Sequence, residues 1–473
     1  MKQVDFSSDR IGASMVKTIF PMLIAQLISL LYNIVDRIYI GRLPGVGTSA
    51  LGGVGLCFPV VILVLGFSNL YGLGGQPLCA MERGRGNTRK AEQIMNTAYF
   101  LLLFTGVILT VLGEIFAEPI LRAFGASSEN IIYGLPYLRI YLTGTVFSML
   151  ATGLNPYINA EGYPRIGMIT VLIGACLNLV LDPILMFPLH MGVAGAAVAT
   201  VVSQAVSAAF VLWFLKGPKT ELHLHLPGRD PLRHVSISEI LSALRENIPV
   251  MGNIISLGAA SFIMQITNSL VSIVCNRTLS IYGGDLYVSI MTVVSSVRQI
   301  LDTPVLTIAE GTSPIISYNY GARKPRSIRK AIKLMCALAV AYTAVMWGLI
   351  LIRPTMFIRI FSSDPEVLSH GGRCLYLYFF AFVFQALQYG GQTTFKALGK
   401  KNQAIFFSIF RKVILVVPLT ILLPRFGSLG AEGVFLAEPV SNLVGGLACF
   451  ITMLLTVLPE MKAMEAETKG ERR

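Results

Sequence analysis

Long apolar segments recur along the whole chain, and short polar segments separate them. A helix needs roughly 20 apolar residues to cross the hydrocarbon core of a bilayer, and on that criterion the sequence predicts about twelve spanning helices. Their ranges are 15–40, 51–80, 94–117, 131–160, 166–188, 192–216, 247–280, 285–317, 328–352, 370–397, 404–425 and 430–458. The pattern therefore predicts an all-α integral membrane protein.

The composition excludes the main soluble classes. Hydrophobic residues make up 54% of the 473 residues, and charged residues make up only 13%, whereas a soluble protein carries about 25% charged residues. A soluble enzyme, a disordered protein and a secreted disulfide scaffold do not fit these values. The seven cysteines lie singly in apolar segments, which is typical of small buried hydrophobes rather than metal ligands.

The longest polar stretch, 216–247, divides the chain near its middle. Apolar residues at helical spacing in its second half predict an amphipathic helix on the membrane surface, capped by Ser236 or Ser238. These residues are Ile237, Ile240, Leu241 and Leu244. The expected organisation is an N-terminal lobe (15–216), a cytoplasmic linker (217–246), a C-terminal lobe (247–458) and a cytoplasmic tail (459–473).

Lysine and arginine are distributed unevenly between the two sides of the predicted membrane. Most of them fall in the linker, in both termini and in the loops on the same side, such as 83–90 and 323–333. Basic residues are enriched in cytoplasmic loops, so both termini and the linker are expected in the cytoplasm. The same bias explains the net charge of +13 without a nucleic-acid partner.

The two halves of the chain repeat each other at an offset of about 237 residues. At this offset Pro77 coincides with Pro314, and at 238 Gly192 coincides with Gly430. A charged set repeats in the same order, namely Arg122, Phe124 and Glu129 with Arg359, Phe361 and Glu366. Each half holds six spans, so both halves enter the membrane in the same orientation. The repeat predicts two pseudo-symmetric six-helix lobes that face each other across a cleft, which is a transporter architecture.

Two acidic residues of the first half lie inside predicted spans. A carboxylate at the centre of a bilayer costs about 2.5–3.5 kcal/mol on the insertion scale, so such residues are functional candidates. Asp36 has Asn33 on the same helix face, and Asp182 follows Asn178 by one helical turn. The alternative is a structural carboxylate near a helix end, which the adjacent Arg37 makes reasonable for Asp36.

The second half also contains buried acids. Glu310 and Glu438 lie inside apolar spans, and an interhelical hydrogen bond is the alternative to a functional role for Glu438. Arg298 and Asp302 are four residues apart, which favours a mutually neutralising structural pair. Amide side chains inside the spans could line a cavity or form interhelical hydrogen bonds. They include Asn33, Asn155 and Gln265.

The remaining chemistry of the chain argues against catalysis. All five histidines lie outside the interiors of the predicted spans, and the sequence contains no phosphate-binding loop of the GxxxxGK[ST] type. No nucleophile lies in a recognisable pattern with a base. We therefore expect no enzymatic activity and no cofactor. A membrane enzyme would need clustered histidines, cysteines or carboxylates at one interface, and a channel would not need bending lobes.

Four stretches of the chain resemble the multidrug and toxic compound extrusion (MATE) transporters. They are YNIVDRIYIG at 32–41, PILRAFGASSENIIYGLPYLRIY at 119–141, SPIISYNYGARK at 313–324 and GAEGVFLAEPVSN at 430–442. The similarity extends over nearly the whole chain. Within the family, the chain looks most like the bacterial multidrug exporters of the staphylococcal type.

The resemblance implies a fold of two six-helix lobes around a central cavity, and it also implies a function. Members of the family export amphipathic, often cationic compounds in exchange for protons or sodium. The residues of this sequence that match the family's cation-coupling positions are Asp36, Asn178, Asp182 and Thr200, and a family tyrosine matches Tyr137. Sodium is the one metal that the resemblance allows, at Asp36, Asn178 and Asp182. Glu310 departs from the pattern, since many relatives carry glutamine there.

The resemblance also bears on setting and partners. It implies a multi-pass protein of a bacterial cell membrane, driven by a proton or sodium gradient, with the lipid bilayer and small drug-like molecules as partners. We expect a monomer. The alternative function is a lipid-linked oligosaccharide or lipid flippase of the same superfamily, which usually carries about fourteen spans and basic cavities.

Overall fold

The structure is a computed structural model that describes residues 3–225, 237–361, 364–426 and 429–470. The side chains of Thr48 and of residues 237–246 and 468–470 lie outside this description. All regular elements in the described ranges are helices. The all-α prediction is confirmed.

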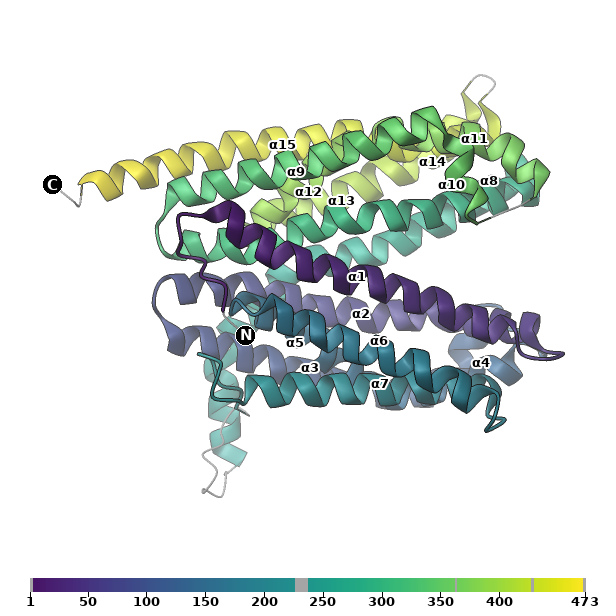
Figure 1. Ribbon diagram of the computed structural model, residues 1–473, viewed down its shortest axis with the longest axis horizontal. Coiled ribbons are helices and arrows are strands. Elements are labelled where there is room, and N and C mark those ends of the chain that lie inside the picture. The colour runs from purple at the N-terminus through teal and green to yellow at the C-terminus, as the bar shows by residue number, and fades with distance from the viewer. Residues whose placement is uncertain (1–2, 226–236, 362–363, 427–428, 471–473) are drawn as a thin grey trace. The chain divides into compact units, whose positions relative to one another are not determined.

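The first half of the chain forms seven helices (Figure 1). They are α1 (Ile11–Gly41), α2 (Gly47–Gly84), α3 (Thr88–Ala123), α4 (Ile131–Thr143), α5 (Thr145–Ala160), α6 (Pro164–Met186) and α7 (Gly192–Leu215). Their ends follow local signals. The Asn87 side chain accepts a hydrogen bond from the backbone N–H of Lys90 and caps α3, and Pro164 occupies the first turn of α6.

The second half contains longer and more interrupted helices. They are α8 (Ile237–Gly321), α9 (Pro325–Ile352), α10 (Pro354–Arg359), α11 (Pro365–Phe379), α12 (Phe382–Ala397), α13 (Lys401–Ile409), the π-helix η1 (Phe410–Val416), α14 (Val417–Leu422), the 3₁₀ turn η2 (Leu423–Arg425) and α15 (Gly430–Gly470). Asp364 caps α11 by accepting from the N–H groups of Glu366 and Val367.

Several helices correspond to the predicted spans only after breaks are taken into account. Nine helices of the described ranges are long and apolar enough to cross a membrane, or ten if α11 and α12, bent by 42°, form one span. Helix α8 has a break at Gly284, where φ is 64° and ψ is −164°, so it supplies two spans. Helices α4 and α5 meet at Gly144 and fill the predicted span 131–160. The second span of α8 and the span formed by α4 and α5, added to the ten spans above, give the twelve expected spans.

The linker differs from the prediction. Helix α8 begins at Ile237 and continues through Asn247 into the first span of the second half, so the surface helix is not a separate element. Ser236 lies outside the described residues. The side chains at 237–246, which include the four predicted apolar positions, lie outside them too.

The internal repeat is visible in the backbone itself. Residues with positive φ recur at equivalent places in the two halves, at offsets of 237 to 239. The pairs are Gly45 and Gly284 (75° and 64°), Gly86 and Arg323 (78° and 52°), Gly162 and Gly399 (89° and 72°), and Gly192 and Gly430 (53° and 49°). The offset grows from 237 to 238 across η1, because the wider π-turn accommodates one extra residue.

The chain forms two compact units. The N-terminal unit comprises Met1–Asp5 and Phe20–Phe262, and the C-terminal unit comprises Phe6–Ile19 and Ile263–Arg473. Each unit has its own hydrophobic core. Within each unit, long helices run alongside one another (Figure 1).

Each unit is completed by the start of a helix that belongs mostly to the other half of the chain. In the N-terminal unit, a Cβ on Gly74 would lie 2.3 Å from the carbonyl oxygen of Ile254 on α8. In the C-terminal unit, a Cβ on the equivalent Gly311 would lie 2.9 Å from Ile19 on α1. Small residues permit such close approaches between helices in membranes. The same contact is therefore made once in each unit.

Candidate functional site

The N-terminal unit places two acidic side chains from different helices next to each other. Asp36 lies on α1 and Asp182 on α6, and their carboxyl groups lie close enough to interact electrostatically. Asp182 is 1% exposed, and Asp36 is half-buried. Two negative charges this close repel each other, so a proton or another cation on the pair relieves the repulsion.

Asn178 connects the acidic pair to a third helix. Its Nδ2 donates to Oδ1 of Asp182 over 3.1 Å and lies 3.3 Å from Oγ1 of Thr200 on α7. Asn178 is 3% exposed, so its amide is fixed between α6 and α7. The structure thus brings together the four residues Asp36, Asn178, Asp182 and Thr200.

No ion pair to the acidic pair is found within the described residues. The guanidinium of Arg37 lies over the ring of Phe58, 4.3 Å from its centroid, instead of forming an ion pair with Asp36. Oδ1 of Asp36 is buried, and no hydrogen bond to it is found in the same part of the chain. A buried polar atom without a partner is costly. The pair therefore offers an acceptor for a cation or a proton.

Aromatic and polar side chains surround this pair. Tyr137 on α4 is 7% exposed and stacks on Tyr141 at 6.5 Å, and the charge of Asp36 acts on both Tyr137 and Tyr32. Asn33 is exposed, and its Nδ2 donates over 2.7 Å to a carbonyl one turn earlier on α1. Tyr137 therefore belongs to the surroundings of Asp36, whereas the Asn33 amide bonds its own helix.

Two of the predicted amide residues lie elsewhere. Nδ2 of Asn155 donates to the carbonyl oxygen of Gly167 over 3.0 Å, and its Oδ1 lies 3.3 Å from Nδ2 of Asn159. This amide joins α5 to α6. Gln265 is half-buried on α8 and belongs to the C-terminal unit.

Glu310 also belongs to the C-terminal unit. It lies on α8 and interacts electrostatically with Lys396 on α12, which is 8% exposed. This acid therefore has a lysine from another helix nearby, unlike Asp36 and Asp182.

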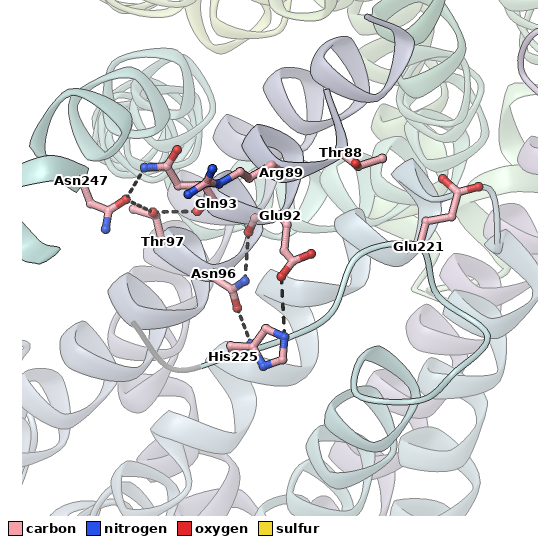
Figure 2. Close-up of a pocket in the computed structure, with 9 residues that line it drawn as sticks. All are labelled: Thr88, Arg89, Glu92, Gln93, Asn96, Thr97, Glu221, His225 and Asn247. Atoms are coloured by element: carbon pink, nitrogen blue, oxygen red, sulfur yellow. Dashed lines mark hydrogen bonds and ion pairs between the residues drawn. The ribbon is translucent and has the colours of Figure 1, made fainter. Parts of the chain in front are cut away.

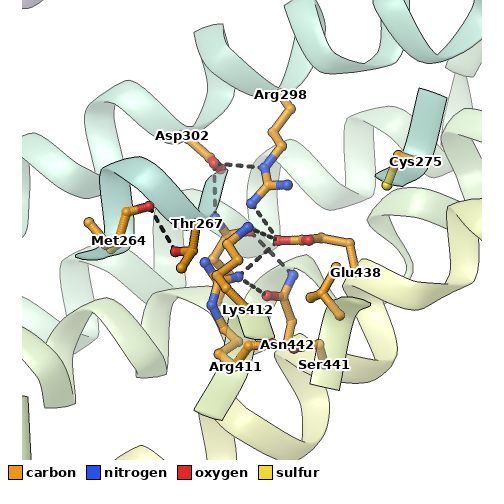
Figure 3. A network of polar contacts seen from close by, with 12 residues as sticks. Met264, Thr267, Cys275, Arg298, Asp302, Arg411, Lys412, Glu438, Ser441 and Asn442 are labelled. Carbon is orange, nitrogen blue, oxygen red and sulfur yellow. Dashed lines mark hydrogen bonds and ion pairs between the residues drawn. The ribbon is translucent and has the colours of Figure 1, made fainter. Parts of the chain in front are cut away.

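Glu438 on α15 lies at the centre of a basic cluster (Figure 3). Its Oε1 accepts hydrogen bonds from Arg298 over 2.6 Å, from Arg411 over 2.9 Å and from Lys412 over 2.8 Å. Glu438, Arg411 and Lys412 are each at most 3% exposed. The carboxylate is thus more than compensated by cations.

The hydrogen bonds of this cluster close into a ring of side chains. Arg298 donates to Asp302 over 3.0 Å, and Gln385 donates to the same carboxylate over 2.9 Å. Asn442 donates to Gln385 over 3.3 Å and accepts from Arg411 over 2.8 Å. Both arginines then meet at the glutamate. The predicted pair of Arg298 and Asp302 is confirmed, as one side of a larger ring.

Sequence analysis missed the two basic residues at the centre of this cluster. Arg411 and Lys412 are adjacent in the apolar segment 404–425, and a double charge inside a predicted span was the signal that could have found them. The π-helix η1 carries both. Such helices often occur at functional sites.

A cavity of about 430 Å³ lies in the N-terminal unit, away from the acidic pair (Figure 2). It is lined by Thr88, Arg89, Glu92, Gln93, Asn96, Thr97, Glu221, His225 and Asn247. Asn96 bonds the backbone of His223 and of His225, and Gln93 donates to Asn247 over 2.9 Å. Helix α3 therefore holds both ends of segment 226–246, and the cavity lies at this junction.

Comparison with known proteins decides the family. The MatE family model matches residues 21–184 and 260–422, which is more than half of the chain. The chain belongs to the MatE family. Its match to that family includes Asp36 and Asp182 in the first segment.

Individual relatives agree with this assignment. The chain is 25% identical over 451 residues to the multidrug export protein MepA of Staphylococcus haemolyticus, and the match covers 95% of both proteins. It is 24% identical to MepA of Staphylococcus saprophyticus over 448 residues, covering 94% of this chain and 95% of the relative.

Solved structures show the fold of this MatE-family chain. An outward-facing multidrug resistance MATE family transporter of the MOP superfamily matches with a TM-score of 0.87 at 22% identity, over 98% of this chain and 99% of the other. A MATE structure in the bent conformation matches with a TM-score of 0.88, at the same identity and coverage. These structures therefore show that the chain has the MATE fold, and its membership of the MatE family makes it a multi-pass membrane transporter.

Proposed function

We propose that this protein exports amphipathic, often cationic compounds by alternating access, in exchange for an inward-moving cation. The pair of buried Asp182 and half-buried Asp36, which has no ion pair in the described residues, is the observation that carries the proposal. Its relatives named as multidrug export proteins support the substrate class.

The pair binds one cation at a time. Two carboxylates in contact in a low-dielectric site cannot both remain charged, because their repulsion adds to the cost of burial. Taking up a proton or a sodium ion removes this cost, and releasing it restores the cost. Asn178 and Thr200 hold Asp182 in place, since they fix its carboxylate between α6 and α7.

A proton is the coupling ion that the geometry favours over sodium. The two carboxyl groups lie within interaction range of each other, so a proton can be shared between them, whereas a sodium ion needs several oxygen ligands around it. Binding of the cation to the acidic pair changes the charge of α1 at Asp36, and a change in charge alters how that helix bends. This change couples cation entry to release of the exported compound.

Efflux measurements in proteoliposomes test this function. Purified protein is reconstituted, and ethidium transport is measured under an imposed proton gradient or an imposed sodium gradient. We expect transport with the proton gradient in the wild type and background transport in Asp36→Asn, which keeps the shape but cannot take up a proton. Asp364→Asn is the control, because asparagine also caps a helix.

Two results would contradict the proposal. Transport by Asp36→Asn at the wild-type rate would exclude Asp36 as the coupling group. Transport that ignores both gradients would exclude cation coupling altogether and favour the flippase alternative.

The orientation of the proposed transporter follows from the uneven distribution of lysine and arginine along the sequence. Both termini and the linker lie in the cytoplasm of a bacterial cell. We also expect the protein to act as a monomer. A single cysteine at position 236, which lies outside the described residues, should resist labelling by an impermeant thiol reagent from outside intact cells. Efficient labelling from outside would reverse the orientation.

A further inference from the structure

The basic cluster of the C-terminal unit carries a surplus positive charge. The ring around Glu438 contains two arginines, Arg298 and Arg411, and two acids, Glu438 and Asp302, so its own charges cancel. Lys412 lies outside this ring and donates to the same oxygen of Glu438. Lys412 therefore adds one positive charge that no further carboxylate in the described part of the cluster compensates.

This surplus is costly where it lies. Lys412 is 2% exposed, and Nε of Arg411 is buried without a hydrogen-bond partner among the described residues. Burying a charge without its own counter-ion destabilises the fold, and apolar replacements of buried ionic groups are often neutral or stabilising. A packed core does not need this lysine. An anion that binds at the cluster would compensate the surplus charge.

The cluster has an accessible edge at Arg298. The side chains of Arg298 and Asp302 are each 17% exposed, whereas those of Arg411 and Lys412 are 3% exposed. The bonds of Arg298 in the described residues go to Asp302, to Tyr378 and to Glu438. A guanidinium has five N–H groups, so three bonds leave two for another acceptor.

The helix surface beside Arg298 is polar. Ser295 and Gln299, the residues three before and one after it on α8, are exposed. Ionisable side chains inside membrane spans almost always face a bundle interior or a water-filled cavity rather than lipid, and Arg298 is such a side chain. An anionic group in water can therefore reach Arg298, with the charges of Arg411 and Lys412 behind it.

We propose that the C-terminal unit binds the carboxylate of zwitterionic substrates at Arg298, and that Lys412 supplies the surplus charge that attracts it. The proposal rests on the export function above and adds a substrate class, compounds that carry a carboxylate as well as a cationic group. Arg298 presents the planar fork that suits a carboxylate. Lys412 is a positioning residue that acts through the field of the cluster.

A matched pair of dyes tests this site. One is a rhodamine with a free carboxylate, and the other is its methyl ester, which is a cation of nearly the same shape. Export of both dyes is measured in proteoliposomes containing the wild type, Lys412→Met or Lys412→Arg. Lys412→Met removes the surplus charge and leaves the charges of the ring balanced, so the variant is expected to fold.

The expected result is specific to the acid dye. In Lys412→Met, the concentration of the acid dye that gives half-maximal export should rise roughly tenfold, the order of magnitude expected when one nearby positive charge is removed from a partly buried site. The value for the ester should stay unchanged. Lys412→Arg should restore export of the acid dye, because it keeps the charge.

Three outcomes would overturn the proposal. An equal loss for both dyes in Lys412→Met would show a purely structural role. Unchanged export of both dyes would show that the charge does not act on substrates. Wild-type export of both dyes that falls equally when chloride is replaced by gluconate would assign the site to chloride. Failure of the export function itself is distinguishable, because the wild type would then transport neither dye.

Discussion

Corresponding positions of the two units carry different chemistry. At the offset of 239 that relates Gly45 to Gly284, Asp36 corresponds to Cys275. At the offset of 238 that holds after η1, Asp182 corresponds to Thr420. Sγ of Cys275 lies 3.8 Å from Oγ1 of Thr420, so the side chains meet in both units, as a pair of acids in one and as a neutral pair in the other.

The acid of the C-terminal unit lies at a different position of the repeat. Glu438 corresponds to Thr200 at the offset of 238, and Arg411 and Lys412 correspond at 237 to Gly174 and Ala175. The same scaffold therefore holds two acids that form no ion pair in the described residues of one unit. In the other unit it holds a glutamate that is bonded to three cations. An acidic residue in a span does not reveal its role. Its role depends on the charges that neighbouring helices place next to it.

The largest expected effect separates the two pairs directly. Asp182→Asn should reduce ethidium export to background, because the acid pair loses a titratable group, and should leave the unfolding temperature unchanged or higher, because a buried charge is removed. Thr420→Val, at the corresponding position, should keep export. The measurement is efflux from cells with matched expression, together with thermal unfolding in detergent. Full export by Asp182→Asn would erase the functional contrast between the units.

The second prediction concerns Glu438 and the stability of the protein rather than its export activity. Glu438→Gln leaves three buried cations without their shared carboxylate, and breaking a buried ion pair in this way typically costs about 3–5 kcal/mol. We expect a large loss of unfolding temperature and of folded protein in the membrane. A variant that stays as stable as the wild type would show that Glu438 does not hold the cluster together.

A third buried acid tests whether burial without a bonded partner is enough to make a group sensitive to pH. Glu161, after α5, is fully buried, and neither of its carboxylate oxygens has a hydrogen-bond partner in the described residues. Burial raises the pKa of Glu161 from 4.5 to about 8, although the nearby Arg83 opposes the shift.

The sign of the pH effect follows from this raised pKa. The folded protein keeps a proton on Glu161 that the unfolded chain releases, so the stabilisation is fully present below pH 4.5 and is lost as the pH rises through about 8. Glu161→Gln should remove this contribution. Thermal unfolding at about pH 5 and about pH 8.5 should show a smaller difference in the variant than in the wild type, by several degrees. An identical difference in both proteins would exclude Glu161 as the source.

The smallest expected effect concerns the backbone that the two units share. Gly45 and Gly284 both have positive φ, and a Cβ on either would meet no atom within 4 Å. Alanine at each position should therefore cost only the backbone strain, roughly 1–2 kcal/mol. Urea unfolding of Gly45→Ala and Gly284→Ala should give similar losses. A much larger loss at one position would show that the two connections are not equivalent.

Sequence alone determined the membrane class, the spans, the repeat and the acids. These properties depend on local hydropathy or on matching positions along the chain, which are fully written in the sequence. The amphipathic linker helix was different: it begins at Ile237 and continues through Asn247 into the next span as part of α8. Local periodicity predicted a helix there but not where it joins the span.

Only the tertiary structure decided what each acid can do. Asp36 and Asp182 are 146 positions apart in the sequence, and their contact depends on how α1 and α6 pack. Arg37 is next to Asp36 in sequence, yet its guanidinium lies over Phe58, whereas Glu438 receives bonds from Arg298, 140 positions away. A buried charge is neutralised by groups that lie within a few ångströms of it. Those groups belong to other helices, and their distance along the sequence does not reveal that they are close in space.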